Sequence, residues 1–244
     1  MKPKSHTLFH FTKNQESLKK ILEHGFWPKF CLEDVRWYND EMESIALPIA
    51  CFCDIPLSRI DEHVDFYGEF GLGLSKNWAI KNGLNPVLYV SNASEVTNSL
   101  IDLSWCHEHY PEKDQRQALK QFFKLLAFTK PIEGKMNVSG KFISKEFYQE
   151  SEWRYLATND DFDSWLNKEE FEDTELREKQ NSLSKNLCSL KIQPADVKYI
   201  FVKDDANIPD MINFIQTNLD SFSGADQKIL MSRVISLESI KHDL

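Results

Sequence analysis

The sequence predicts an α+β protein with a mixed or mostly antiparallel β-sheet. Short runs rich in aromatic and β-branched residues predict strands, and an apolar stripe at helical spacing over residues 112–129 predicts a long helix. These elements do not alternate as regular strand–helix–strand units, which argues against a wholly parallel sheet. The 244 residues include only 8 glycines and 9 prolines, which argues against a turn-dense sandwich or barrel.

The N-terminal part is predicted to begin with a strand over Leu8–Thr12. Asn14 is a favourable residue at a helix N-cap and Gly25 at a helix C-terminus, so a helix is predicted between them. Residues 27–47 mix aromatic and charged side chains and are predicted to form a long, partly ordered loop. The apolar run Ile49–Cys53 predicts the next strand.

The C-terminal half is predicted to continue from the helix over 112–129 to a strand over Glu152–Leu156. Residues 160–178 carry nine acidic residues against two basic ones, which is typical of a solvated surface segment. We therefore predict a single domain over residues 1–244, in which residues 160–180 form an acidic surface insertion.

The composition indicates a folded chain, because 41% of the residues are hydrophobic and 27% are charged. The formal net charge of −9 and the pI of about 5.3 indicate long-range repulsion of nucleic acid. A local basic groove remains compatible with this charge.

The five cysteines are odd in number and irregular in spacing, which favours reduced thiols in the cytoplasm over a disulfide framework. Their spacing also lacks the ligand pattern of a zinc site, so no metal is predicted. No apolar run reaches the ~20 residues of a membrane helix, and no apolar segment of a secretory signal follows the N-terminus. A cytoplasmic protein that is not inserted in a membrane is expected.

Three places in the sequence have residue types that are unusual for packing alone. The first is the opening strand, where His10 and Thr12 share a face and present two hydrogen-bonding groups side by side. The alternative is a core histidine whose ring is satisfied by a backbone carbonyl.

The second place is the stretch from Tyr67 to Ser75. If it is extended from Phe70 onwards, Gly71 and Gly73 leave bare backbone on one face, which is typical of a close approach by a ligand or another backbone. The rings of Tyr67 and Phe70 would then offer a surface for a flat heterocycle. The alternative is a glycine pair where chains cross in a core.

The third place is the strand with Glu150, Glu152 and Arg154, whose side chains are expected on one face, while Trp153 and Tyr155 face the packing. A carboxylate beside a guanidinium suits a base or an electrostatic stabiliser. The alternative is a row of surface ion pairs.

Together these places resemble the His-Tyr-Glu pattern of ADP-ribosyltransferases. The wider sequence is similar to the AbiGi family of abortive phage-resistance proteins. The segments that carry this second resemblance are Leu8–Thr12, Cys51–Ser58, Tyr67–Lys76, Pro86–Tyr89, Lys130–Pro131 and Phe147–Tyr155.

The transferase resemblance implies an ADP-ribosyltransferase-like fold with a split sheet that binds NAD. It implies that Glu152 stabilises the oxocarbenium ion of the transferred ribose and that Glu150 orients the acceptor. His10 would bind a ribose hydroxyl and Thr12 would shape the pocket. The ring of Tyr67, or that of Phe70, would stack on nicotinamide. The residues expected around NAD are His10, Thr12, Tyr67, Phe70, Gly71, Gly73 and Ser75.

The function expected from the two resemblances is an NAD-dependent ADP-ribosyltransferase that acts as a toxin in anti-phage defence. Its acceptor would be a protein or a nucleic acid, and its gene neighbour would supply a cognate toxin or antitoxin. The alternative is a non-catalytic antitoxin that grips a basic partner through the aromatic-rich residues 27–47 or the acidic residues 160–178.

Overall fold

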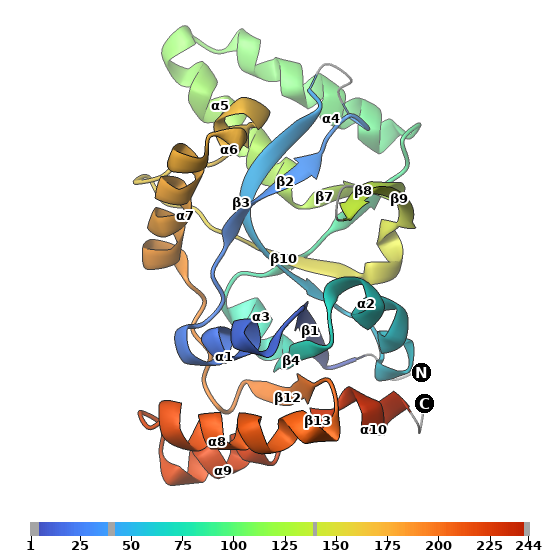
Figure 1. Ribbon diagram of the computed structural model, residues 1–244. Helices are drawn as coiled ribbons and strands as arrows, with labels where there is room; N and C mark the ends of the chain where they lie inside the picture. Colours follow the sequence, from blue (N-terminus) through green and yellow to red (C-terminus); the bar gives the residue numbers. More distant parts are fainter. Residues whose placement is uncertain (1–4, 39–41, 139–140, 242–244) are drawn as a thin grey trace. The chain divides into compact units, whose positions relative to one another are not determined.

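The computed structural model describes residues 5–38, 42–138 and 141–241, and it is a mixed α/β structure (Figure 1). Its described residues form a multi-stranded sheet, two small two-stranded sheets and ten α-helices. This confirms the predicted α+β class. The chain divides into two compact units, which comprise Met1–Phe26, Cys51–Leu84 and Ser189–Leu244 (unit 1), and Trp27–Ala50 and Asn85–Cys188 (unit 2). The single-domain organisation stays a prediction.

Unit 1 contains a sheet with the strand order β13-β12-β4-β1-β3. The pairs β3–β1, β1–β4 and β4–β12 are antiparallel, whereas β12 and β13 are parallel, so the sheet is mixed as predicted. The strands are β1 (Thr7–Thr12), β3 (Ser44–Cys53, in this unit from Cys51 onwards), β4 (Phe70–Ser75), β12 (Val197–Val202) and β13 (Val234–Ser236).

The helices of unit 1 include α8 and α9, which lie side by side (Figure 1). Asn14 caps the first helix by accepting the N–H of Ser17, and Gly25 ends it with φ of 89°, as predicted. The helical segments are α1 (Gln15–His24), η1 (Leu57–Arg59), α2 (Ile60–Tyr67), α3 (Lys76–Lys81), η4 (Asp205–Asn207), α8 (Ile208–Asn218), α9 (Gly224–Met231) and α10 (Leu237–Lys241).

The core of unit 1 includes a group of packed aromatic rings. Phe9 and Phe11 of β1 pack with Phe201 of β12, and Ile60 and Val64 of α2 join the same buried cluster. The ring centroids of Phe9 and Phe201 are 5.8 Å apart. Burial of such aromatic side chains is a main stabilising contribution of a core.

Unit 2 contains the first part of β3, which pairs antiparallel with β2 and with β11 and neighbours β10. Strand β10 pairs antiparallel with β5. Two further pairs, parallel β6–β7 and antiparallel β8–β9, form the small sheets. The strands are β2 (Lys29–Asp34), β5 (Asn85–Pro86), β6 (Leu88–Val90), β7 (Thr129–Pro131), β8 (Glu133–Val138), β9 (Lys141–Glu146), β10 (Glu152–Leu156) and β11 (Leu166–Asn167).

The helices of unit 2 include α5, which buries the predicted stripe residues Phe122, Phe123 and Leu126. Helices α6 and α7, which carry much of the acidic segment, pack beside β2 (Figure 1). The helical segments are α4 (Glu95–Trp105), η2 (Cys106–His109), α5 (Glu112–Ala127), η3 (Phe147–Glu150), α6 (Lys168–Glu172) and α7 (Thr174–Cys188).

The predicted loop over residues 27–47 is wrong. Apart from residues 39–41, which lie outside the described residues, this stretch holds β2 and the start of β3, and the two strands pair along the whole length of β2. Tyr38 is buried, and the indole N–H of Trp27 donates to the carbonyl of Asn181. The aromatic residues are mostly packing residues because the hairpin joins the sheet.

The cysteines are all free thiols. In the part of the chain that the structure describes, no helix combines the length and the apolar character of a membrane span. Within the same residues, no group of three or more His, Cys, Asp or Glu side chains is placed to hold a metal ion.

Candidate functional site

The candidate residues of unit 1 lie mainly on two neighbouring strands. In the β1–β4 register His10 is opposite Leu72, and Thr12 is opposite Phe70. His10, Thr12 and Phe70 therefore share one face of the two strands, whereas Gly71 and Gly73 pair with Phe11 and Phe9 and belong to the opposite face.

His10 is held by its own unit. Its Nδ1 lies 2.8 Å from the carbonyl oxygen of Cys51. Its ring packs edge-on against Phe26, with ring centroids 5.0 Å apart, and tilted against Phe52, with centroids 5.5 Å apart. Burial lowers the pKa of His10, and the hydrogen bond to Cys51 offsets this only in part. The geometry matches the alternative of a core histidine satisfied by a backbone carbonyl.

The lowered pKa of His10 predicts a loss of stability in mild acid. Below pH 6.5 the unfolded chain binds a proton at this side chain before the folded chain does, so the free energy of unfolding falls as the pH falls. One group contributes at most about 1.4 kcal/mol per pH unit. Urea unfolding at pH 7.5, 6.5 and 5.5 should show a smaller acid loss for His10→Gln than for the parent chain. Parallel curves for the two proteins would contradict this assignment.

The remaining polar candidates of unit 1 are engaged in local structure. The Thr12 hydroxyl donates to the carbonyl of Asn14 at 3.0 Å. Ser75 is the N-cap of α3 and accepts the N–H of Trp78 at 3.2 Å. Tyr67 ends α2, and its ring lies 4.4 Å from that of His63. These contacts explain the residues through capping and packing.

The predicted bare backbone at Gly71 and Gly73 is wrong. A Cβ atom at Gly71 would lie 2.5 Å from the Phe11 ring, and one at Gly73 would lie 2.8 Å from the Tyr199 ring. The glycines are needed because aromatic side chains cover the strand at these positions. The alternative of a glycine pair in a core is the observed arrangement.

Glu150 and Glu152 lie in unit 2 and do not sit on one continuous strand as predicted. Glu150 ends η3, and Ser151 adopts a left-handed backbone with φ of 44° before β10 begins at Glu152. The charged side chains are also the more buried ones, because Glu150, Glu152 and Arg154 are buried, whereas Trp153 is only partly buried. The alternative of a surface ion-pair row is therefore wrong as well. Tyr155 packs against a core cluster, as predicted.

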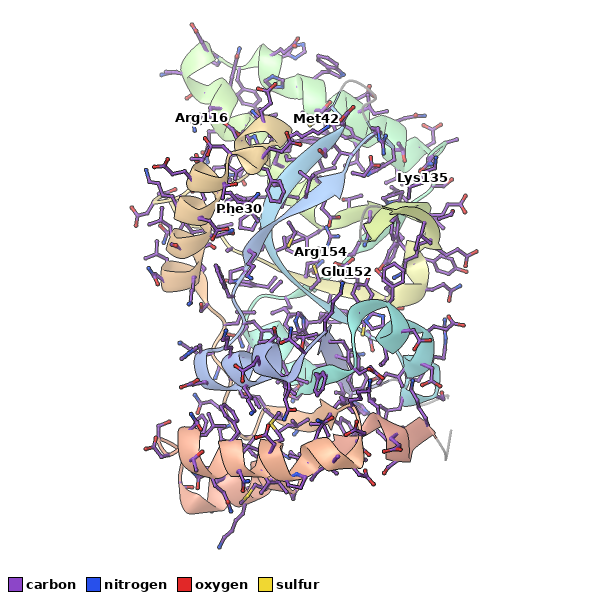
Figure 2. The ribbon with its side chains drawn as sticks, viewed as in Figure 1. Phe30, Met42, Arg116, Lys135, Glu152 and Arg154 are labelled. Carbon is purple, nitrogen blue, oxygen red and sulfur yellow. The ribbon has the colours of Figure 1, made fainter. Side chains whose placement is uncertain are left out.

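The buried charges form one network, which we call the ion network and define as Glu33, Lys130, Lys145, Glu150, Glu152 and Arg154. Arg154 is only 1% exposed; its Nε lies 2.7 Å from Glu152 Oε1 and its Nη2 2.7 Å from Glu33 Oε2. Figure 2 shows Glu152 and Arg154 beside each other on β10. The Arg154 Nη1 also donates to the carbonyl of Ala127 at 2.8 Å.

Two lysines complete the ion network. The Nζ of Lys130 lies 3.0 Å from Glu152 Oε2 and 3.4 Å from Glu150 Oε2, and the Nζ of Lys145 lies 2.5 Å from Glu150 Oε1. Lys130 also lies over the Phe147 ring, 4.3 Å from its centroid. Three carboxylates thus face three cations, so the buried charges are matched.

The local electrostatics follow from this matching. Burial by itself lowers the pKa of Lys130, but the carboxylates of Glu152, Glu33 and Glu150 outweigh it, so the pKa is raised. Burial raises the pKa of the neighbouring Tyr89 to about 12, and its hydroxyl oxygen accepts the N–H of Glu152 at 2.8 Å. Burial and Glu33 likewise raise the pKa of the Cys31 thiol to about 11.

The sequence reasoning missed Lys130, Lys145 and Glu33. A signal was present, because a predicted buried strand with two carboxylates and one guanidinium needs further cations to balance it. Lys130 follows the long helical stripe and is the middle residue of the short strand β7. Its pairing with a strand some twenty residues later is a tertiary contact that local patterns do not show.

The ion network does not suit the catalytic roles predicted for Glu150 and Glu152. Both carboxylate oxygens of Glu152 accept from Arg154 and Lys130, and those of Glu150 face Lys130 and Lys145. The glycines expected beside the dinucleotide are covered by rings. The arrangement of these residues therefore does not fit NAD. The charged side chains of the ion network pair with one another instead.

Comparison with known proteins gives two matches. A family model described as "Putative abortive phage resistance protein AbiGi, antitoxin" matches residues 24–203. The "Abortive phage resistance protein AbiGi" of Lactococcus lactis subsp. cremoris is 27% identical over 253 aligned residues, which cover 90% of this chain and 99% of that protein. No solved structure matches the chain.

These matches confirm the resemblance to AbiGi and lend no support to the transferase pattern or an ADP-ribosyltransferase-like fold. The predicted function, a toxin that transfers ADP-ribose from NAD, is contradicted because the family description names an antitoxin. Transferase activity, NAD binding and the predicted acceptor stay predictions without support from any match.

Proposed function

Because the chain belongs to the AbiGi family of abortive phage resistance proteins, we propose that it is an antitoxin that binds and neutralises a cognate toxin protein. The observation that carries the proposal is the match of residues 24–203 to a family described as an antitoxin. The ion network supports a binding role over a catalytic one, since the two carboxylates predicted to be catalytic, Glu150 and Glu152, pair with cations of the same chain.

The charge of the chain favours a cationic partner. A net charge of −9 attracts a positively charged protein at long range and speeds their encounter. Of the two contact regions considered from the sequence, residues 27–47 hold paired strands, while eight of the nine acidic residues between 160 and 178 are exposed. The acidic segment is therefore the better contact surface.

The proposal is tested by expressing the product of the neighbouring gene in bacteria with and without this chain. The partner alone should arrest growth, co-expression should restore it, and a tag on one protein should co-purify the other. A gene for this chain with an early stop codon is the control and should restore nothing. Growth arrest that persists despite a soluble, folded chain, or rescue without any complex, would contradict neutralisation by binding.

A further inference from the structure

Unit 2 contains a cavity of about 580 Å³ at the acidic segment. Its volume lies in the range of sites that hold a small ligand or a few side chains of a partner. The residues that line it are Lys113, Arg116, Gln117, Lys120, Asp160, Asp161, Phe162, Asp163, Ser164, Trp165, Glu170 and Gln180.

The cavity has two walls of opposite charge. One wall is α5, where Lys113, Arg116 and Lys120 are spaced three and four residues apart and so share a side of the helix. The other wall comes from residues 160–170 and carries the carboxylates of Asp160, Asp161, Asp163 and Glu170. In Figure 2, Arg116 is labelled where α5 approaches α6.

Several of the lining residues are fixed by contacts within the chain. Gln180 is buried, and its Oε1 accepts the N–H of Asp163 at 3.0 Å while its Nε2 donates to Asp163 Oδ2 at 2.5 Å. The ring of Trp165 lies 4.5 Å from that of Phe123 on α5. A partner would therefore meet a shape that is already ordered, which limits the entropy lost on binding.

Two ion pairs also link lining residues. Arg116 is 86% exposed and lies 3.8 Å from Asp163, and Lys120 lies 3.1 Å from Asp160, which is 99% exposed. The Arg116–Asp163 pair is long and exposed, and Asp160 is exposed although its partner Lys120 is only 21% exposed. Ion pairs with an exposed member contribute little to stability, so their charges can be exchanged for those of a partner. Among the described residues, Lys113 and Asp161 have no ion-pair partner at all.

The mixed lining selects the chemistry of the occupant. A purely anionic group would meet four carboxylates, and a purely cationic group would meet three cations. A segment that carries one basic and one acidic side chain pairs with both walls.

We propose that this cavity receives such a segment of the cognate toxin, with its basic side chain at Asp161 and its acidic side chain at Lys113 and Arg116. This inference rests on the proposed antitoxin function and names the place where the toxin is anchored. The exposed acids elsewhere on α6 and α7 then act mainly through long-range attraction.

The test is a pair of charge swaps that leave the net charge unchanged. Lys113→Glu with Asp161→Lys reverses one residue on each wall. Glu175→Lys with Lys179→Glu is the matched control, because both of its residues are exposed on α7 and outside the cavity lining. Binding of the purified neighbouring-gene product is measured by calorimetry for the parent and both variants, and thermal unfolding verifies that all three are folded.

The cavity swap is expected to raise Kd about tenfold or more, and the control swap less than about threefold. Equal effects of the two swaps, or no effect of the cavity swap, would overturn the cavity as the anchor while leaving the antitoxin function standing. Absence of binding by the parent chain would overturn both proposals together.

Discussion

Replacement of Arg154 by alanine is expected to lower the free energy of unfolding by about 3–5 kcal/mol. The guanidinium is 1% exposed and pairs with Glu152 and Glu33, so its removal leaves two carboxylates without their cation. The carbonyl of Ala127 also loses a charged hydrogen-bond donor. Urea unfolding followed by circular dichroism measures the change.

The control for this prediction is Lys168→Ala, which breaks an exposed pair with Glu43. Exposed ion pairs contribute about 0–1 kcal/mol, so this variant should remain close to the parent. If Arg154→Ala is no more destabilising than Lys168→Ala, the ion network is not the buried, matched set of charges described above.

The ion network also changes how variants of Glu152 are interpreted. Glu152→Gln removes a charge that Arg154 and Lys130 share, so it is expected to weaken the fold of unit 2. A loss of function in this variant would therefore report stability as much as chemistry. Expression level and unfolding free energy have to be measured beside any activity.

Replacement of Gly68 by alanine is expected to destabilise the protein by about 3–5 kcal/mol, the sum of backbone strain and overpacking. Gly68 ends α2 with φ of 124°, a conformation that is almost restricted to glycine. A Cβ atom there would lie 2.1 Å from the carbonyl oxygen of Thr12 and 2.6 Å from the Cα of Lys13. Because both contacts are with backbone, a side-chain rotation cannot relieve them.

Gly83 is the matched control for Gly68. It also has a positive φ, of 76°, but nothing lies within 4 Å of the position of its Cβ. Gly83→Ala should therefore show the backbone strain alone, about 1–2 kcal/mol. Thermal and urea unfolding of the two variants should separate clearly, and similar losses would mean that Thr12 and Lys13 do not lie against Gly68.

The sequence by itself determined the features that depend on near neighbours. Alternation and β-branched or aromatic residues located β1, β3 and β10, and the stripe over residues 112–129 located α5. Asn14 and Gly25 marked the ends of α1 because capping is a local property of the backbone. The resemblance to AbiGi also came from the residues alone.

Only the tertiary structure decided which charges meet and which faces are buried. A left-handed Ser151 places Glu150 in a turn rather than on β10. Lys130 and Glu33 then reach the buried carboxylates and Arg154 from strands far away in the chain. The physical reason is that a buried charge is stable only beside a partner of opposite sign, and that partner is supplied by the fold rather than by neighbours in sequence.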